Sequence, residues 1–250
     1  MIKPNSIILG DYNDHLPLIP DKSVDMINCD LPYNMTACKW DKEIDLEQLW
    51  THYKRIIKDN GAIVLTASQP FTSKLVMSNL KWFKYEWVWY KSKCGSSFIA
   101  KYRPESKHEN VLVFGIGKVT YNPQMEYGEA YQRRECRRNK NSHKLGIKKR
   151  LSVVNNGTRF PETVQYFQQK WRRDDQLHPT QNPVALYEYL IKTYTNEGDT
   201  VLDNCCGVAT TAIACLNLNR DYICIEKDNE YYDKGIQRIK EHTRQMRLVI

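Results

Sequence analysis

The feature that most constrains this 250-residue chain is a repeated alternation of short apolar runs with amphipathic helical stretches. The runs at 24–30, 61–66 and 111–114 are expected to be strands, and the stretches at 46–58 and 71–80 have the spacing of helices. Strands that alternate with helices predict a mostly parallel sheet with helices on both faces. We therefore expect an α/β fold of the doubly wound, Rossmann-like kind.

The alternation breaks after Gly117 and returns at Pro183. Residues 121–177 are polar and weakly periodic, and they contain thirteen Lys and Arg against six Asp and Glu. This segment therefore carries nearly all of the net charge of +8. A localised basic surface favours a polyanionic partner, nucleic acid first. The alternative is a surface insertion that is merely solvated.

Two features argue against other classes of protein. The sequence has no apolar run long enough for a transmembrane helix, and its first residues lack the apolar stretch of a signal peptide. The eight cysteines include no C-x-x-C pair, so neither a zinc site nor a disulfide framework is expected. We expect a cytoplasmic protein with reduced cysteines, no metal and no membrane association.

The segment 200–226 has the pattern strand, Gly-containing turn, helix, strand, and both strands end in an acid. In open α/β sheets ligands bind beyond the carboxyl ends of the strands, where such acids lie. The turn lacks the G-x-G-x-x-G that a dinucleotide pyrophosphate requires. S-adenosylmethionine has no phosphate, and the Asp203 carboxylate is suited to oppose its positive charge. We therefore expect S-adenosylmethionine as cofactor, the alternative being a scaffold unit without a ligand.

Another apolar strand ends at the tetrapeptide Asp30-Leu31-Pro32-Tyr33. The exocyclic amine of adenine is a poor nucleophile because its lone pair is delocalised into the ring. The Asp30 carboxylate and the Leu31 carbonyl can accept its two N–H bonds, and Pro32 fixes the backbone that carries them. Tyr33 offers a ring face to a base taken out of the stack. The alternative is an ordinary strand-end Asp before a turn with a packed Tyr.

With both segments in view, the sequence resembles the beta-class amino-methyltransferases of DNA, which methylate adenine N6 or cytosine N4. The family's D-P-P-Y appears at residues 30–33, and its H-P-T-Q-K-P appears at 178–183. Shorter matches are G-D at 10–11, S-V-D at 23–25, K-H-E at 107–109, V-L-D at 201–203 and T-T at 210–211. The resemblance covers nearly the whole chain outside 121–177, with the catalytic half ahead of the cofactor half, the order that defines the class.

The resemblance implies one circularly permuted methyltransferase domain over residues 1–250. It divides into a catalytic half (1–120), an inserted target-recognition region (121–177) and a cofactor half (178–250). The resemblance gives catalytic roles to Asp30, Leu31, Pro32 and Tyr33. It expects Asp11 at the cofactor's adenine and Glu226 at its ribose. The full set of cofactor residues it implies is Asp11, His178, Pro179, Thr180, Asn182, Asp203, Cys205, Gly207, Thr211 and Glu226.

Nucleic-acid contacts are expected from one tryptophan and from the basic residues of the central segment. The cluster from Arg133 to Lys140 has helical spacing and is predicted to lie along a phosphate backbone, the alternative being a solvated helix face. Trp40 follows the tetrapeptide and is predicted to stack on a base, with plain packing as the alternative. The candidates are Trp40, Arg133, Arg134, Arg137, Arg138, Lys140, Lys148, Lys149 and Arg150.

Three positions depart from the family pattern. Leu31 replaces the first Pro of D-P-P-Y, where only the backbone carbonyl is needed. Asn182 replaces a Lys and so removes a charge near the cofactor. The loop 204–209 replaces a pattern close to P-F-x-G-S-G, and an aromatic residue and one Gly are lost.

The function predicted is methyl transfer to N6 of an extruded adenine in a short DNA sequence, of the restriction-modification or phage type. Cytosine N4, RNA and a protein amide are alternative acceptors, and cytosine is disfavoured because that group more often has Ser at the position of Asp30. A non-catalytic nucleic-acid-binding protein with a decayed cofactor loop is the alternative from another class. The expected partners are DNA and, because dimers are common in the resembled family, a second copy of the chain.

Overall fold

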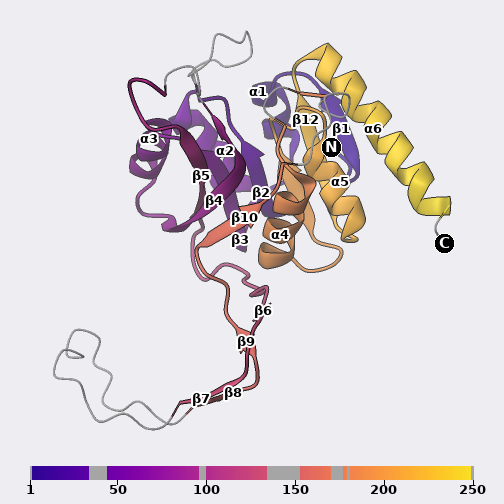
Figure 1. The fold of residues 1–250 in the computed structure, drawn as a ribbon. Helices are drawn as coiled ribbons and strands as arrows, with labels where there is room; N and C mark the ends of the chain where they lie inside the picture. Colours follow the sequence, from indigo (N-terminus) through magenta and orange to yellow (C-terminus); the bar gives the residue numbers. More distant parts are fainter. Residues whose placement is uncertain are drawn as a thin grey trace. The chain divides into compact units, whose positions relative to one another are not determined.

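Figure 1 shows the computed structural model, which describes residues 2–33, 44–95, 100–133, 153–169, 177–178 and 181–248. The chain divides into two compact units. The larger comprises Met1–Asn122 and Thr163–Ile250, and the smaller is Pro123–Glu162. The smaller unit is therefore shorter than the predicted insertion at 121–177, and the functional division into three parts stays a prediction.

The larger unit is built on a sheet with the order β1-β12-β11-β2-β3-β5-β4-β10. Strand β5 is antiparallel to both of its neighbours, β3 and β4, and the other pairs are parallel. The predicted mostly parallel α/β fold is therefore confirmed. The strands are β1 (Ser6–Leu9), β2 (Val24–Asp30), β3 (Ile57–Ala67), β4 (Phe83–Gly95), β5 (Ser106–Phe114), β10 (Val164–Phe167), β11 (Thr200–Asp203) and β12 (Asp221–Glu226).

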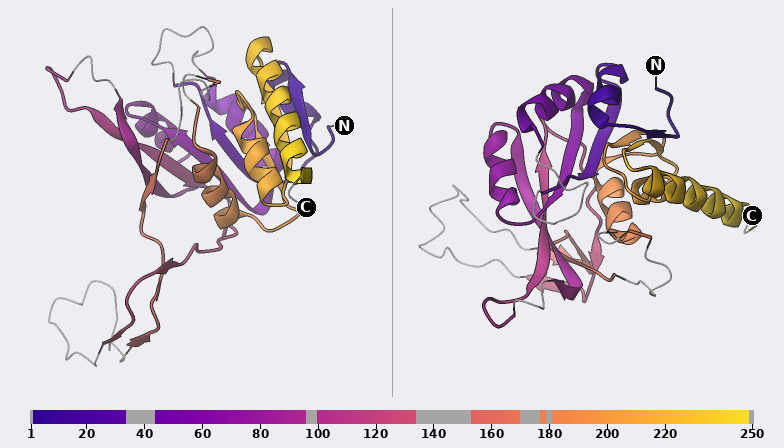
Figure 2. Two further views of the ribbon diagram at one scale, coloured as in Figure 1. Left: turned by 45° about the vertical axis from the view of Figure 1, so that its right-hand side comes forward. Right: turned by 90° about the horizontal axis from the view of Figure 1, so that it is seen from above.

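Helices cover both faces of this sheet (Figure 2). On one face, α2 (Leu46–Ile56) and α3 (Phe71–Ser78) pack in one hydrophobic cluster with β2, β3 and β5. On the other, α4 (Val184–Tyr194) and α5 (Thr210–Asn217) form a second cluster, and α6 (Asn229–Leu248) contacts β1 and β12. The short α1 (Tyr12–His15) and the 3-10 turn η1 (Leu16–Leu18) connect β1 to β2.

Local sequence explains these elements. Helix α2 begins after Asp45, whose carboxylate accepts hydrogen bonds from the backbone N–H of Glu47 (3.0 Å) and Gln48 (3.1 Å). Its buried residues recur at spacings of three and four, which gives the helix one apolar face. Strand β2 is buried from Val24 to Cys29, as expected for a central parallel strand covered on both faces.

The sequence predicts most of the regular elements of the larger unit but misses β1 and β10. Both strands have only four residues and lie at the outer edges of the sheet. Strand β10 also lies within the polar segment that was expected to be an insertion, and two of its four side chains are exposed. Such short strands are set by pairing with a neighbour, which a local apolar pattern does not reveal.

The smaller unit consists of two short antiparallel ladders. Strand β6 (Glu126–Tyr127) pairs with β9 (Thr158–Arg159), and β7 (Tyr131–Arg133) pairs with β8 (Val153–Asn155). Arg133 is therefore a strand residue, so the prediction that it begins a helical face is wrong. Pairing of β7 with β8 outweighs the local helical spacing of the charged residues, and this pairing cannot be predicted from that spacing.

No helix in the described part of the chain is long and apolar enough to cross a membrane.

Candidate active site at the carboxyl edge of the sheet

The connections of the sheet diverge between β11 and β2. Strand β11 leads through α5 to β12 on one side, whereas β2 leads through α2 to β3 on the other. Such a switch point opens a crevice at the carboxyl ends of the strands, where ligands bind in open α/β sheets. Because β1, β12, β11 and β2 run parallel, their carboxyl ends share one edge. That edge carries an acid after or at the end of every one of these strands, namely Asp11, Glu226, Asp203 and Asp30.

Asp30 is held by three side-chain donors. The Tyr33 hydroxyl donates to Oδ1 at 2.6 Å, and the hydroxyl of Thr66 donates to the same oxygen. Thr66 is the cross-strand partner of Asp30 on β3. The Asn182 amide donates to Oδ2 at 2.9 Å. Both carboxylate oxygens are therefore fixed in direction.

The two residues that flank Pro32 anchor the tetrapeptide. The Leu31 side chain is only 2% exposed and belongs to the core, so an apolar residue at this position has a packing role. The Tyr33 ring stacks on Phe71 of α3, with 5.2 Å between ring centroids. Burial, reinforced by the negative charge of Asp30, raises the pKa of Tyr33 well above its usual value. Tyr33 therefore stays protonated and acts as a donor to Asp30.

Asp203 lies at the end of β11 in a fully buried position. The backbone N–H of Cys205 donates to Oδ1 at 3.1 Å, and the Thr211 hydroxyl donates to Oδ2. Burial outweighs these hydrogen bonds and raises the pKa of Asp203 to about 7. The next residue, Asn204, accepts a hydrogen bond from the Tyr53 hydroxyl of α2 at 2.6 Å, which ties the loop to the opposite layer of helices.

Glu226 is held by backbone donors. The N–H of Gly207 donates to Oε2 at 2.8 Å, and that of Asp228 donates to Oε1 at 2.7 Å. Burial is the main reason that the pKa of Glu226 is raised. At the neighbouring strand end, the carboxylate of Asp11 accepts a hydrogen bond from the Lys227 ammonium at 2.6 Å. Burial on its own would raise the pKa of Asp11, but contacts including this one lower the pKa below its usual value.

The turn between β11 and α5 has two residues in left-handed conformations. Gly207 has φ +52° and Ala209 has φ +60°, and Ala209 is the residue that stands where the family pattern has its second Gly. Arg238 of α6 donates to the Val208 carbonyl at 2.9 Å and to the Thr210 hydroxyl at 3.0 Å. Arg238 therefore supports a turn that carries the strain of a Cβ at position 209.

The family whose description is DNA methylase matches this chain over residues 24–237. This chain belongs to the DNA methylase family. DNA adenine methyltransferase YhdJ of Escherichia coli (strain K12) is 31% identical over 250 residues, which is 94% of this chain and 82% of that protein. The type II methyltransferase M.HpaI of Haemophilus parainfluenzae is 27% identical over 239 residues, 88% of this chain and 69% of that protein.

Solved structures with the same fold accompany these relatives. The methylase superposes on M1.HpyAVI in its complex with S-adenosylmethionine with a TM-score of 0.63 and 23% identity, covering 94% of this chain and 98% of that one. It superposes on the PvuII DNA methyltransferase, described as cytosine-N4-specific, with a TM-score of 0.67 and 15% identity. This match covers 98% of this chain and 93% of the PvuII chain. The resemblance to DNA amino-methyltransferases found in the sequence is therefore confirmed, and the methylase uses S-adenosylmethionine as its family does.

The acids at the carboxyl edge fit this cofactor chemically. S-adenosylmethionine supplies an electrophilic methyl group on a positively charged sulfur. Of the four acids, only Asp11 forms an ion pair with a described residue, and its partner is Lys227. Asp203 is buried and Glu226 is half-buried, and burial raises the pKa values of both, so a cationic ligand would favour their charged forms.

The segment before α4 contributes two described residues to this edge. The ring of His178 lies edge-on to Tyr231 with 4.1 Å between centroids, and a Cβ on Gly207 would be 3.9 Å from the His178 ring. Asn182 donates to the Tyr187 hydroxyl (3.2 Å) as well as to Asp30. Pro179 and Thr180 lie outside the described residues, so their predicted cofactor roles stay predictions.

The predicted nucleic-acid contacts lie almost entirely outside the described residues. These are Trp40, Arg134, Arg137, Arg138, Lys140, Lys148, Lys149 and Arg150, and only the backbone of Arg133 is described. Residues that the sequence analysis missed include Thr66, Tyr53 and Arg238. The position of Thr66 could have been predicted from the sequence. It ends the apolar run of the strand after β2, and parallel neighbouring strands end at the same edge of a sheet, so Thr66 is expected near Asp30.

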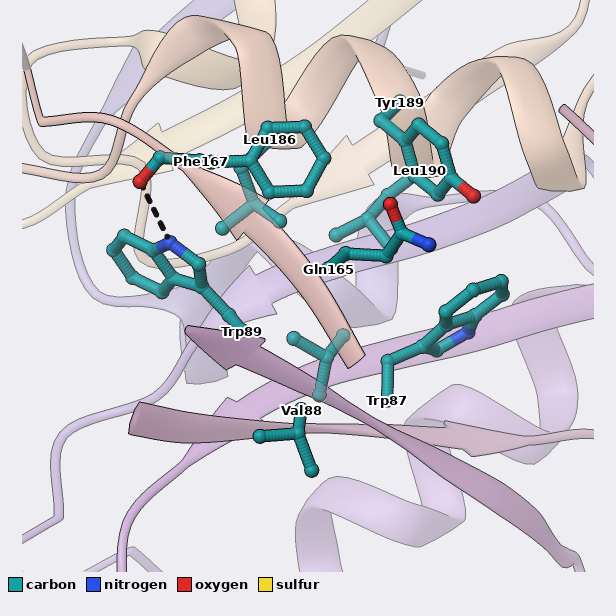
Figure 3. Close-up of a pocket in the computed structure, with 9 residues that line it drawn as sticks. Trp87, Val88, Trp89, Gln165, Phe167, Leu186, Tyr189 and Leu190 are labelled. Atoms are coloured by element: carbon teal, nitrogen blue, oxygen red, sulfur yellow. Dashed lines mark hydrogen bonds between the residues drawn. The ribbon is translucent and has the colours of Figure 1, made fainter. Parts of the chain in front are cut away.

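A small apolar pocket lies elsewhere in the methylase, between β4, β10 and α4 (Figure 3). The Trp89 indole N–H donates to the Phe167 carbonyl at 3.2 Å beside it. None of the four acids lines this pocket, so we attribute it to imperfect packing of the edge strand β10 on α4. Its lining residues are Trp87, Val88, Trp89, Val111, Gln165, Phe167, Leu186, Tyr189 and Leu190.

Proposed function

We propose that this methylase transfers a methyl group to the exocyclic N6 of an adenine extruded from a short, specific DNA sequence. The observation that carries the proposal is the geometry of Asp30, a carboxylate with both oxygens held by neighbouring donors and placed beside the strand that ends in Asp203. The similarity to a relative named as a DNA adenine methyltransferase supports adenine as the base.

The proposed chemistry begins with positioning of the amine. Asp30 and the Leu31 carbonyl accept its two N–H bonds, which draws the nitrogen towards a tetrahedral form with its lone pair directed at the methyl group. Because the carboxylate is already oriented by three donors, no reorganisation would be needed as the N–C bond forms. The methyl–sulfur bond would break in the same step and leave a neutral thioether, and the amine would lose one proton to the Asp30 carboxylate that already accepts its N–H. Tyr33, protonated and stacked on Phe71, keeps Asp30 in this orientation and faces the extruded base.

The remaining acids are proposed to hold the cofactor. Asp203 opposes its positive charge, Glu226 binds the ribose hydroxyls with the lone pairs left by its two backbone donors, and Asp11 lies at the adenine. His178, Pro179, Thr180, Cys205, Gly207 and Thr211 complete this proposed site. The smaller unit and the basic residues around it are proposed to recognise the target sequence.

A DNA substrate and the free state of the described cysteines support a location in a reducing compartment, which we propose is the cytoplasm.

The proposal is tested by incubating the protein with labelled S-adenosylmethionine and mixed genomic DNA and by identifying the methylated nucleosides. We expect N6-methyladenine, whereas N4-methylcytosine would reassign the base; in a parallel incubation with RNA in place of DNA, transfer of label to RNA alone would reassign the acceptor. Asp30→Ala should lower the rate of transfer at least about 10³-fold, because an acceptor aimed at the reacting amine is lost. Its affinity for S-adenosylmethionine should match the wild type, and unchanged activity would remove Asp30 from the mechanism.

A further inference from the structure

The hairpin formed by β4 and β5 extends beyond the rest of the sheet (Figure 2). The two strands pair from Phe83↔Phe114 to Gly95↔Ser106, whereas the pairing of β3 with β5 stops at Ala67↔Asn110. Both β3 and β4 are antiparallel to β5, so β4 runs parallel to β3. The free end of the hairpin therefore lies at the carboxyl edge of the sheet, the edge that carries Asp30.

The base of this extension adjoins the candidate active site. Glu109 of β5 forms an ion pair with Lys91 of β4, and it lies close enough to Asp30 for the two negative charges to interact. The Lys91 ammonium also lies 4.7 Å from the centroid of the Trp89 ring. The hairpin thus begins at the proposed reaction centre and leads away from it.

The end of the hairpin is strongly basic. We define the hairpin end as Ser92–Gly95 together with residues 100–107; it contains four Lys and Arg and a single acid, Glu105. Lys93, Lys101 and Arg103 are exposed, and none of them forms an ion pair with a described residue. Tyr102, between two of these cations, is 88% exposed. An exposed ring flanked by cations offers a stacking face next to charges that can contact phosphates.

The edge strand β10 continues this surface. The rings of Tyr90 and Tyr166 lie 5.9 Å apart and are 39% and 56% exposed. The Lys107 ammonium lies 5.2 Å from the centroid of the Tyr90 ring. Exposed aromatic faces combined with cations match the chemistry of a nucleic-acid strand, which offers phosphates to the cations and sugars or bases to the rings.

We infer that the hairpin end binds the sugar-phosphate backbone of the DNA beside the extruded adenine. The inference rests on the proposed function, because it assigns the same DNA a second contact outside the central basic segment. The position supports it, since the hairpin starts next to Asp30 and ends in cations that lack acidic partners among the described residues. A binding surface here would hold the duplex close to the reaction centre, and recognition of the target sequence could remain elsewhere.

The test compares two triple variants with the same loss of charge. Lys93→Gln, Lys101→Gln and Arg103→Gln together neutralise the hairpin end. Lys81→Gln, Lys84→Gln and Lys118→Gln neutralise three exposed cations near the opposite ends of the same two strands and serve as the control. Affinity for a duplex that the wild type methylates is measured by fluorescence anisotropy across a range of salt concentrations, and the kinetics of methyl transfer are measured with both variants.

We expect the hairpin-end variant to bind DNA roughly 10- to 100-fold more weakly at 0.15 M salt, with a salt slope shallower by about 2 to 3. Its KM for DNA should rise while kcat stays near the wild-type value, and the control variant should match the wild type. Both variants should bind S-adenosylmethionine normally, which establishes that they are folded.

Three outcomes would overturn the inference or the proposal beneath it. Equal DNA affinity of the two variants would show that the hairpin end is a solvated surface. A change in sedimentation of the hairpin-end variant, with DNA binding intact, would assign the surface to a second copy of the chain. If the wild type methylates no DNA at all, the proposed function itself fails, and this result is distinct because it appears before any variant is made.

Discussion

The two sides of the carboxyl edge hold their acids by different means. On the β2 side, every donor to Asp30 among the described residues is a side chain, from Tyr33, Thr66 and Asn182. On the β11 and β12 side, backbone N–H groups of the loops donate to Asp203 and Glu226, and Thr211 adds a side-chain donor. The first side therefore depends on side-chain identity, whereas the second depends largely on backbone conformation.

The two sides also differ in charge balance. Burial raises the pKa values of Asp203 and of the half-buried Glu226, and neither forms an ion pair with a described residue. A positively charged ligand would therefore be stabilised more strongly on this side of the edge than on the β2 side. The difference leads to three predictions, in order of decreasing effect.

The largest effect is expected for Asp203→Asn. Removing the charge that we propose opposes the cofactor should weaken the binding of S-adenosylmethionine roughly 100-fold at pH 8, because one partner of a buried charge pair would be lost. In the wild type, affinity should rise with pH until it levels off above about pH 7, since a protonated Asp203 must lose its proton on binding. Calorimetry in buffers of different ionisation enthalpy measures this proton release, which the variant should lack.

The stability of the free protein should change in the opposite direction with pH. The pKa of Asp203 is about 7 in the folded chain against 3.8 as its ordinary value, so the folded state binds more protons than the unfolded state between these pH values. Stability should therefore fall as pH rises through this window, and Asp203→Asn should flatten that part of the profile. A profile equal to that of the wild type would mean that Asp203 is ionised in the free protein.

An intermediate effect is expected for Asn182→Leu. The change removes the donor to Oδ2 of Asp30, so kcat should fall roughly 10-fold, while affinity for S-adenosylmethionine should stay within about twofold of the wild type. The control is Tyr187→Phe, which removes only the other acceptor of the Asn182 amide. A loss confined to cofactor affinity would instead place Asn182 with the cofactor, as the sequence resemblance implied, and would break the comparison between the two sides.

The smallest effect is expected for Ala209→Gly. Ala209 has φ +60° and ψ +39°, a conformation that costs a residue with a Cβ about 1 kcal/mol, so the variant should raise Tm by roughly 2–4 °C. Ala212→Gly, in the buried interior of α5, should lower Tm because glycine disfavours a helix. Thermal unfolding measures both. A lower Tm for Ala209→Gly would show that the turn is relaxed as it stands.

Three of the four acids, Asp30, Asp203 and Glu226, were predictable from the sequence because each ends an apolar run, whereas Asp11 was implied only by the family resemblance. Once the runs at 24–30, 200–203 and 221–226 are interpreted as parallel strands, their terminal acids must meet at one edge. Thr66 follows from the same reasoning applied to the next strand. These residues share a local signal, an apolar strand that stops at a polar side chain.

The other contacts were not predictable because they depend on elements far apart in the chain. Asn182 reaches Asp30 only because β11 inserts beside β2, and the family pattern suggested a cofactor role for it. Arg238 supports the turn at Val208 from a helix that reads as an ordinary charged surface helix. Strand β10, which is a short edge strand, and the basic hairpin end were also not predicted from the sequence. The large positive charge of 121–177 drew attention away from the smaller positive charge of the hairpin end.

The junctions of the smaller unit are both fastened within the larger one. At the first, the Asn122 N–H donates to the Thr193 carbonyl at 2.7 Å; at the second, the Val88 N–H donates to the Thr163 carbonyl at 2.8 Å. A segment tethered at two fixed points can be lengthened, shortened or exchanged at modest entropic cost, because loop-closure entropy grows slowly with length. With the proposed role of the smaller unit in target recognition, replacing the residues between these tethers would change the DNA target and leave the strand ends of the larger unit unaltered.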